Sequence, residues 1–92
     1  MAKLSEGEIK SILAAQPQWK VADGALTREW VFKDFVEAMT FVNRIAAIAE
    51  AAGHHPDIDI RYNKVRLSLI SHDLGGITER DAAFVTHLQQ ET

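Results

Sequence analysis

The sequence predicts an α+β fold in two layers: a four-stranded antiparallel sheet with three helices packed on one face, in the order α-β-β-α-β-β-α. Short alternating apolar runs occur in two pairs, each pair joined by a turn dipeptide, and three amphipathic segments begin at residues typical of helix N-caps. Because 92 residues can enclose only one core, we expect a single domain over residues 1–92.

The first part of the chain predicts one helix and one hairpin. The capping box Ser5-x-x-Glu8 opens a short helix, and Pro17 ends it. Two strands follow, around residues 19–21 and 26–32, because Asp23-Gly24 between them is a strong hairpin-turn dipeptide. Leu26, Trp30 and Phe32 lie on one face of the second strand, with Arg28 as the odd polar member. The aromatic side chains expected in the core rather than on a stacking platform are Trp19, Trp30 and Phe32.

A long central helix comes next. Asp34 is its predicted N-cap, with Glu37 at the capping-box position. Gly53 occupies the place of a left-handed C-cap, so the helix should end just before His54. We expect its buried stripe to consist of apolar residues at helical spacing: Phe35, Met39, Val42, Ala46 and Ala49.

The second hairpin is predicted with Asn63-Lys64 as its two-residue turn. In this register every apolar residue meets an apolar residue: Ile60 lies opposite Leu67, and Ile58 lies opposite Leu69. The last helix begins at Thr78-x-x-Asp81, and its apolar stripe is Phe84, Val85 and Leu88.

On the outer face, the same register sets Arg61 opposite Arg66. Like charges in direct opposition are unfavourable. The pair is therefore either splayed into solvent or neutralised by a partner.

Three of the four histidines lie within nineteen positions of one another. The predicted register, extended outward, brings His55 opposite His72, with His54 adjacent and Pro56 directing the chain out of the helix. Histidine has an unperturbed pKa of about 6.5 and so exchanges protons near neutral pH. We expect a proton-transfer site formed by these three imidazoles.

Two carboxylates belong to the same prediction. Glu50, four residues before His54, could accept a hydrogen bond from an imidazole, and Asp81 lies on the inward stripe of the last helix. Simpler interpretations stay open: either could be an ordinary helix carboxylate, and His87 is expected to be solvated. A zinc site of three histidines has the right ligand type, but adjacent histidines tend to diverge, so we expect no metal.

Composition excludes several other classes of protein. The sequence has no cysteine, so it has neither a disulfide framework nor a thiolate metal site. The net charge of −3 argues against direct nucleic-acid binding. The longest mostly apolar stretch, Ile45 to Gly53, is too short to cross a bilayer, and the first residues lack the apolar segment of a signal peptide. We therefore expect a cytoplasmic protein with no membrane partner.

The histidine motif resembles that of the pterin-4a-carbinolamine dehydratase family. The resemblance covers nearly the whole chain and includes the segments 62–65 and 78–81. Gly53 is a departure, because some relatives carry an acidic residue there. The matching positions have the gaps that the family pattern expects: Glu50, His54-His55-Pro56, Tyr62, His72 and Asp81.

This resemblance implies a hydro-lyase that dehydrates a 4a-hydroxytetrahydropterin to the quinonoid dihydropterin during tetrahydropterin recycling, without a cofactor. The implied catalytic residues are His54, His55 and His72, of which His55 would chiefly bind substrate. Tyr62 is expected mainly to pack. The implied substrate-binding or orienting residues are Glu50, Pro56 and Asp81.

The resemblance also implies a homodimer or homotetramer. The rival hypothesis is a protein-interaction module, because animal members of the family also serve as a dimerisation cofactor for a homeodomain transcription factor. The retained acid/base set favours the enzyme.

Overall fold

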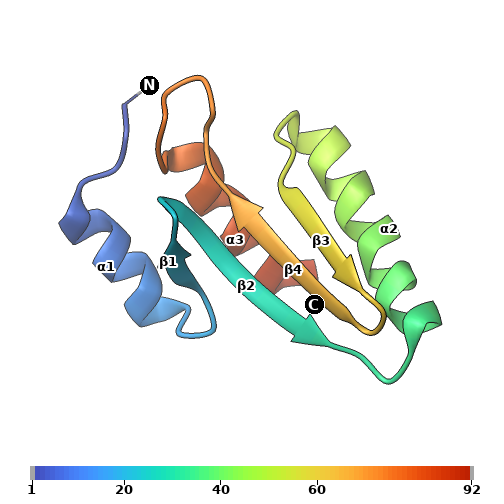
Figure 1. Cartoon of the computed structure of the whole chain (residues 1–92). Helices are drawn as coiled ribbons and strands as arrows, with labels where there is room; N and C mark the ends of the chain where they lie inside the picture. Colours follow the sequence, from blue (N-terminus) through green and yellow to red (C-terminus); the bar gives the residue numbers. More distant parts are fainter. Residues whose placement is uncertain (1, 92) are drawn as a thin grey trace.

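The computed structural model describes residues 2–91, and within them the elements follow the predicted order (Figure 1). The fold class is confirmed. The helices are α1 (Glu6–Ala15), α2 (Phe35–Ala52) and α3 (Glu79–Glu91), and the strands are β1 (Lys20–Ala22), β2 (Ala25–Val31), β3 (Asp57–Arg61) and β4 (Lys64–Leu69).

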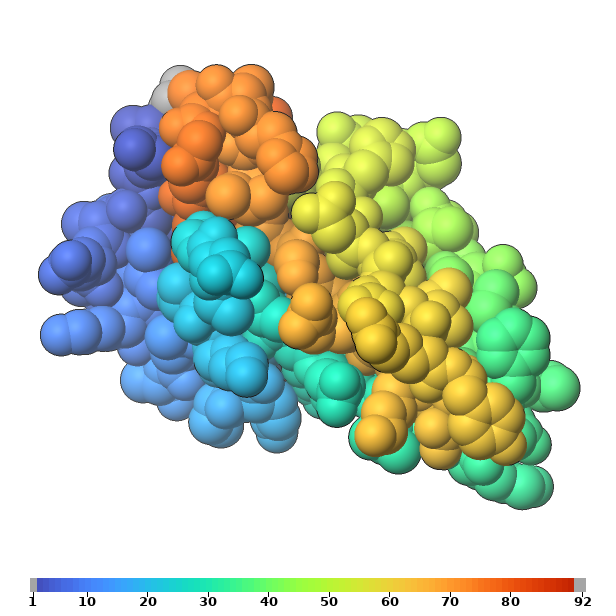
Figure 2. Space-filling view, viewed as in Figure 1, coloured from blue at the N-terminus to red at the C-terminus, as the bar shows by residue number. Residues whose placement is uncertain are grey.

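The four strands form one antiparallel sheet in the order β1-β2-β4-β3, so β3 and β1 are its edges. Figure 1 shows α3 behind the sheet, α2 beside and behind β3, and α1 next to β1. The opposite face of the sheet, at the front of Figures 1 and 2, is not covered by a helix. The core therefore lies between the sheet and the helices.

The predicted caps at Ser5, Asp34 and Gly53 are confirmed, but the capping box at Asp34 is not formed, because the Glu37 side chain accepts from the Lys33 N–H instead of the Asp34 N–H. The Ser5 and Glu8 capping box is formed in both directions, and the Asp34 side chain accepts a hydrogen bond from the Glu37 backbone N–H at 2.9 Å. Gly53 has φ 65° and ends α2 in the left-handed conformation that glycine adopts without a Cβ clash. These caps fix where α2 stops and hence where the histidine segment begins.

The first hairpin turns at Asp23-Gly24 as predicted. Both residues have positive φ, 52° and 78°, and Ala22 pairs with Ala25 across the turn. Positive φ at both central positions suits the right-handed twist of the strands.

The second hairpin differs from its prediction by one residue in each strand. Its turn residues are Tyr62-Asn63, and Lys64 is already paired with Arg61. The reason lies in the residue that follows β2: the Asn63 side chain donates to the Phe32 carbonyl at 2.9 Å, and the Phe32 N–H donates to the Asn63 carbonyl at 2.8 Å. Asn63 is thereby held at the end of β2, which fixes the position of the turn.

This shift keeps the apolar pairing but changes the partners. Ile60 faces Val65 and Ile58 faces Leu67, because a shift of one residue in each strand leaves every side chain on its face. The predicted opposition of Arg61 and Arg66 is wrong, since Arg66 faces Asp59.

The prediction that Tyr62 mainly packs is also wrong. Its side chain is exposed, and its φ of 56° is uncommon for an aromatic residue. The reason is its place in the turn, where it does not point into the core.

An aromatic cluster fills the core where β2 meets α2. The Trp30 ring lies 4.8 Å from that of Phe41 and 5.8 Å from that of Trp19, centroid to centroid, which confirms the predicted packing role of the tryptophans. The Arg28 guanidinium carbon lies 4.4 Å from the Trp30 centroid, and partial burial lowers the pKa of Arg28.

The predicted buried stripe of α2 is largely wrong. Phe35 is exposed, and the sheet instead covers a stripe rotated around the helix: Ala38, Phe41, Ile45, Ile48 and Ala49. Because α2 carries apolar residues on more than one side, helical spacing alone does not select the buried side. The sheet packs against the side with the larger residues.

Candidate functional site

All six predicted site residues lie at the same end of the molecule. Glu50 is in the last turn of α2, the segment 54–56 joins α2 to β3, and His72 and Asp81 lie after β4 and in the first turn of α3. In Figure 1 this end is at the top, where the turn after α2 and the loop after β4 lie. The antiparallel pairing of β3 with β4 produces this gathering, since the start of one strand lies beside the end of the other.

His54 and Asp81 form the buried part of the site. The His54 Nε2 atom lies 2.5 Å from Asp81 Oδ1, and the side chains are 11% and 0% exposed. The Phe84 ring packs edge-on to the imidazole at 6.4 Å between centroids. A histidine held in this way by a buried carboxylate has a fixed ring orientation.

Asp81 has further donors at its second oxygen. Oδ2 accepts hydrogen bonds from the Thr78 backbone N–H at 2.8 Å and from Ser71 Oγ at 3.0 Å. The first contact is the capping-box bond of α3, in which the N3 carboxylate returns to the N-cap N–H. The helix start thus places Asp81, and its free oxygen faces His54.

His55 and Glu50 make an exposed pair. The His55 Nε2 atom lies 3.1 Å from Glu50 Oε2, with side chains 64% and 76% exposed. Glu50 therefore orients the second histidine of the doublet. As a solvated pair it contributes little to stability.

His72 lies on an exposed loop and does not oppose His55 as predicted. The β3–β4 ladder ends at the pair of Asp57 with Ser68, and the His72 Nε2 atom lies 3.8 Å from Asp57 Oδ2. The one-residue change of turn moves the partner of each β3 residue by two positions, which is why the predicted opposition is wrong. Within the described chain, the three imidazoles each contact a different carboxylate.

The loop that carries His72 is closed at both ends. Ser71 and Gly76 form an isolated antiparallel bridge, and Gly75 has φ 67°. Asp73 accepts a hydrogen bond from the Arg80 guanidinium at 2.7 Å, and this bond lowers the pKa of Asp73. The loop is thus attached to the first turn of α3, the same turn that holds Asp81.

Two hollows adjoin the histidines. One of about 230 Å³ lies on the outer face of the sheet and includes Asp57, Ser68 and His72. In Figure 2 it lies between the cyan β1–β2 turn, the yellow start of β3 and the orange segment after β4. The other, of about 160 Å³, lies over His54, Arg80 and Phe84. His54 and His72 therefore lie at the same end of the molecule but border hollows on opposite faces of the sheet.

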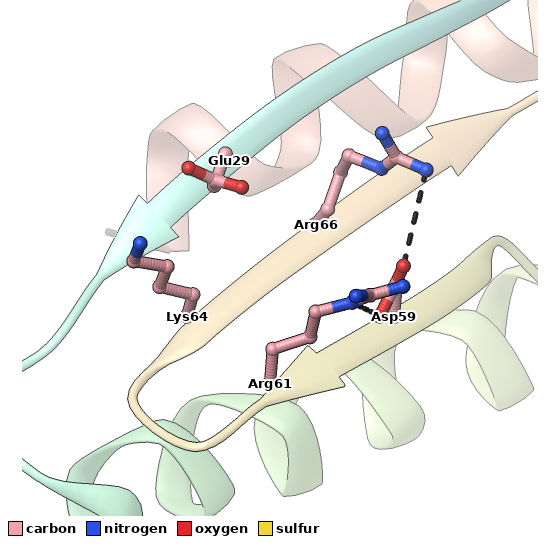
Figure 3. Close-up of a pocket in the computed structure, with 5 residues that line it drawn as sticks. All are labelled: Glu29, Asp59, Arg61, Lys64 and Arg66. Carbon is pink, nitrogen blue, oxygen red and sulfur yellow. Dashed lines mark hydrogen bonds and ion pairs between the residues drawn. The ribbon is translucent and has the colours of Figure 1, made fainter.

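A third hollow, of about 120 Å³, lies farther along the outer face and is lined only by charged side chains (Figure 3). Asp59 pairs there with Arg61 at 3.2 Å and with Arg66 at 3.8 Å. The other lining residues are Glu29 and Lys64. These internal pairs balance much of the charge, so the hollow resembles a solvated sheet face.

Across residues 2–91, no three histidine or acidic side chains come together in a way that could hold a metal ion. In the same range, none of the helices is both long enough and apolar enough to cross a bilayer.

Sequence reasoning missed Ser71 and Thr78 as members of this site. Ser71 Oγ and Thr78 Oγ1 lie 2.7 Å apart, and both side chains are buried. Thr78 could have been found, since its capping-box pattern with Asp81 was recognised. Ser71 has no local signal, because its partners are seven and ten residues away.

Comparison with known proteins agrees with the family resemblance that the histidine motif indicates. The family model described as pterin 4 alpha carbinolamine dehydratase matches residues 2–90. A protein of Thermomicrobium roseum is 53% identical over 90 residues, covering 98% of this chain and 97% of its own. One of Acidobacterium capsulatum is 56% identical over 81 residues, covering 88% of each chain. The names of both relatives assign them to the same family.

A solved structure is similar over nearly its full length. The crystal structure of a transcriptional coactivator/pterin dehydratase from Brucella melitensis has a TM-score of 0.88 to this chain. It is 34% identical in sequence, and the alignment covers 96% of each chain.

Proposed function

This chain belongs to the pterin 4 alpha carbinolamine dehydratase family, and we propose that it dehydrates a 4a-hydroxytetrahydropterin to the quinonoid dihydropterin by histidine acid/base catalysis. The observation that carries the catalytic part of the proposal is the buried pair of His54 with Asp81, at 2.5 Å. A base held in one orientation is what a positioned proton transfer requires.

The reaction needs two proton movements. A base removes the N5 proton of the pterin, the C4a–N5 double bond forms, and the C4a–O bond breaks as an acid protonates the hydroxyl, which leaves as water. One imidazole has then gained a proton and another has lost one, so a proton exchange with solvent or between them restores the enzyme. No oxidant, reductant or metal enters this balance.

We assign the acid and base roles to His54 and His72, and pterin binding to His55. Glu50 holds His55 at 3.1 Å, and Asp81 holds His54. His72 is exposed beside a hollow, so a ligand can reach it. Pro56 belongs to the binding segment, because it separates the histidine doublet from β3.

His72→Ala tests this assignment. We expect turnover in a stopped-flow dehydration assay to fall at least about tenfold, since positioned acid/base groups typically contribute about 10²–10⁴-fold. His72 is exposed, so the fold should persist, as checked by circular dichroism. Asn43→Ala, an exposed substitution on α2, is the control and should keep full turnover. Unchanged turnover in His72→Ala would remove His72 from the mechanism.

We also propose that the chain forms a homodimer or homotetramer. On α2, Phe35 and Val36 are 48% and 73% exposed, and on the edge strand β3 Ile58 and Ile60 are 37% and 38% exposed. Large apolar side chains at a sheet edge and along a helix are typical of contact surfaces. Light scattering coupled to size exclusion should give a mass above that of one chain, and Val36→Glu should lower it if α2 supplies the contact.

A further inference from the structure

The buried side of the site contains a chain of hydrogen bonds that runs in one direction. Thr78 Oγ1 and Ser71 Oγ lie 2.7 Å apart, Ser71 Oγ donates to Asp81 Oδ2 at 3.0 Å, and Asp81 Oδ1 meets His54 Nε2 at 2.5 Å. All four residues are buried, with Ser71, Thr78 and Asp81 no more than 1% exposed. Buried polar groups in such a network constrain one another strongly.

Counting the protons fixes the direction of each bond. Ser71 has one hydroxyl proton, and it goes to Asp81, so Ser71 accepts the proton of Thr78. Thr78 Oγ1 itself accepts from the Arg80 backbone N–H at 3.2 Å. Asp81 Oδ2 already has two donors, Ser71 and the Thr78 N–H, which leaves no place on it for a carboxyl proton.

The consequence reaches the imidazole. A carboxylic acid is a stronger acid than an imidazolium, so the proton between Asp81 Oδ1 and His54 Nε2 lies on the nitrogen. The carboxylate oxygen then accepts it. In neutral His54 the second nitrogen, Nδ1, is then unprotonated. The side chain then has a lone pair at Nδ1 and a proton at Nε2. Because Asp81 occupies Nε2, Nδ1 is the nitrogen left for another group.

Ser71 also links this network to the loop of His72. Its backbone N–H donates to the Gly76 carbonyl at 2.9 Å, and its carbonyl accepts from the Gly75 N–H at 2.9 Å. The residue that binds Asp81 is thus the first residue of the loop that presents the next histidine. Ser71 therefore contacts both the carboxylate that holds His54 and the backbone of the loop that carries His72.

We propose that Ser71 and Thr78 are positioning residues: by holding Asp81 as an acceptor they fix His54 in the Nε2–H tautomer and make Nδ1 the nitrogen that exchanges a proton with the substrate. This rests on the proposed function for the identity of the substrate. The tautomer itself does not depend on which substrate binds.

The direct test is the tautomer of His54, read from the ¹⁵N shifts of its ring nitrogens in the whole chain at alkaline pH. We expect the unmodified protein to show the Nε2–H form alone. Observation of the Nδ1–H form in that protein would overturn the proposal, whether or not any variant folds.

Substitutions then test the two hydroxyls. Ser71→Ala and Thr78→Val should each release a measurable share of the Nδ1–H tautomer, and the conservative Ser71→Thr and Thr78→Ser should restore the single form. Ser11→Ala and Thr86→Val are matched controls, because these hydroxyls bond only to the preceding turn of their own helices. A single, unchanged tautomer in both Ser71→Ala and Thr78→Val would contradict the proposal.

Kinetics give the second readout. Ser71→Ala should lower kcat about five- to tenfold with KM unchanged, a factor that corresponds to one net hydrogen bond of about 1–1.4 kcal/mol. A change in KM alone would contradict a positioning role. An unmodified protein without dehydratase activity would refute the proposed function, and the tautomer measurements would still decide the role of Ser71 and Thr78.

Discussion

Replacing Asp81 with asparagine should destabilise this protein more than any single polar substitution on its surface. The carboxylate is fully buried and accepts hydrogen bonds from Ser71 Oγ, the Thr78 N–H and His54 Nε2. Asparagine has nearly the same shape but only one acceptor oxygen, and its amide group brings two donors. At least one of the present donors must therefore face another donor or find a new partner.

The size of the effect follows from which end of the amide faces His54. If the oxygen stays with Ser71 and Thr78, the amide N–H meets His54, which must change tautomer and loses the charge-assisted bond. If the amide is reversed, the Thr78 N–H loses its buried acceptor. A hydrogen bond to a charged group is worth about 1.5–3 kcal/mol and breaking a buried pair costs about 3–5 kcal/mol, so we expect a loss of about 2–4 kcal/mol.

Urea unfolding measures this loss. With an m-value of about 1–1.5 kcal/mol/M for a small domain, the midpoint should fall by about 1.3–4 M while m stays constant. Asp57→Asn is the matched control, because this exposed carboxylate only approaches His72 at 3.8 Å, and we expect a change within about 0.5 kcal/mol. If Asp81→Asn moved the midpoint no further than Asp57→Asn does, the network around Asp81 would not be formed as described.

Three further outcomes are expected. Tyr62→Gly should raise the free energy of unfolding, measured with urea, by about 0.5–1 kcal/mol, because the left-handed φ of 56° strains an exposed tyrosine but not a glycine. A lower free energy of unfolding would show that contacts of the ring stabilise the fold. The hydrogen bond from Arg80 lowers the pKa of Asp73 in the folded protein, so the ionised pair stabilises the fold above pH 3.8, the ordinary carboxyl pKa. This stabilisation is lost as the pH falls through the lower pKa of the folded state. A carbon-detected NMR titration should show the lowered pKa, and Arg80→Gln should return it toward 3.8. Asp59→Asn on the outer face should cost less than about 1 kcal/mol, and less still in 1 M salt, since its ion pairs are exposed; a loss independent of salt would point to packing.

The elements that were predicted best from the sequence are those whose cause lies within a few residues. The caps at Ser5 and Asp34, the Gly53 helix end and the Asp23-Gly24 turn each depend on neighbours in the chain. Local rules describe such contacts fully. Local signals of this kind also predict the order of the elements.

The predictions that were wrong concern features that residues distant in the sequence determine. The turn of the second hairpin is decided by two bonds between Asn63 and Phe32, 31 residues apart. Likewise, α2 offers apolar residues on several sides, and only the docked sheet selects the stripe around Phe41 and Ile45. Neither choice can be read from periodicity, since both alternatives obey it.

The corrected register changes how a substrate would have to lie. When the pairing of β3 with β4 is continued beyond its last pair, Asp57 with Ser68, Ser71 lies across from His54. This placement agrees with the contacts that His54 and Ser71 both make with Asp81. Neighbouring residues of an extended chain point to opposite faces, so His72 points to the outer face, where it lines the hollow with Ser68. A pterin that meets both His54 and His72 must therefore lie across the end of the sheet rather than on either face. A structure with a dihydropterin soaked in would reveal this position, and a ring bound wholly on one face would leave only one of the two histidines for the reaction.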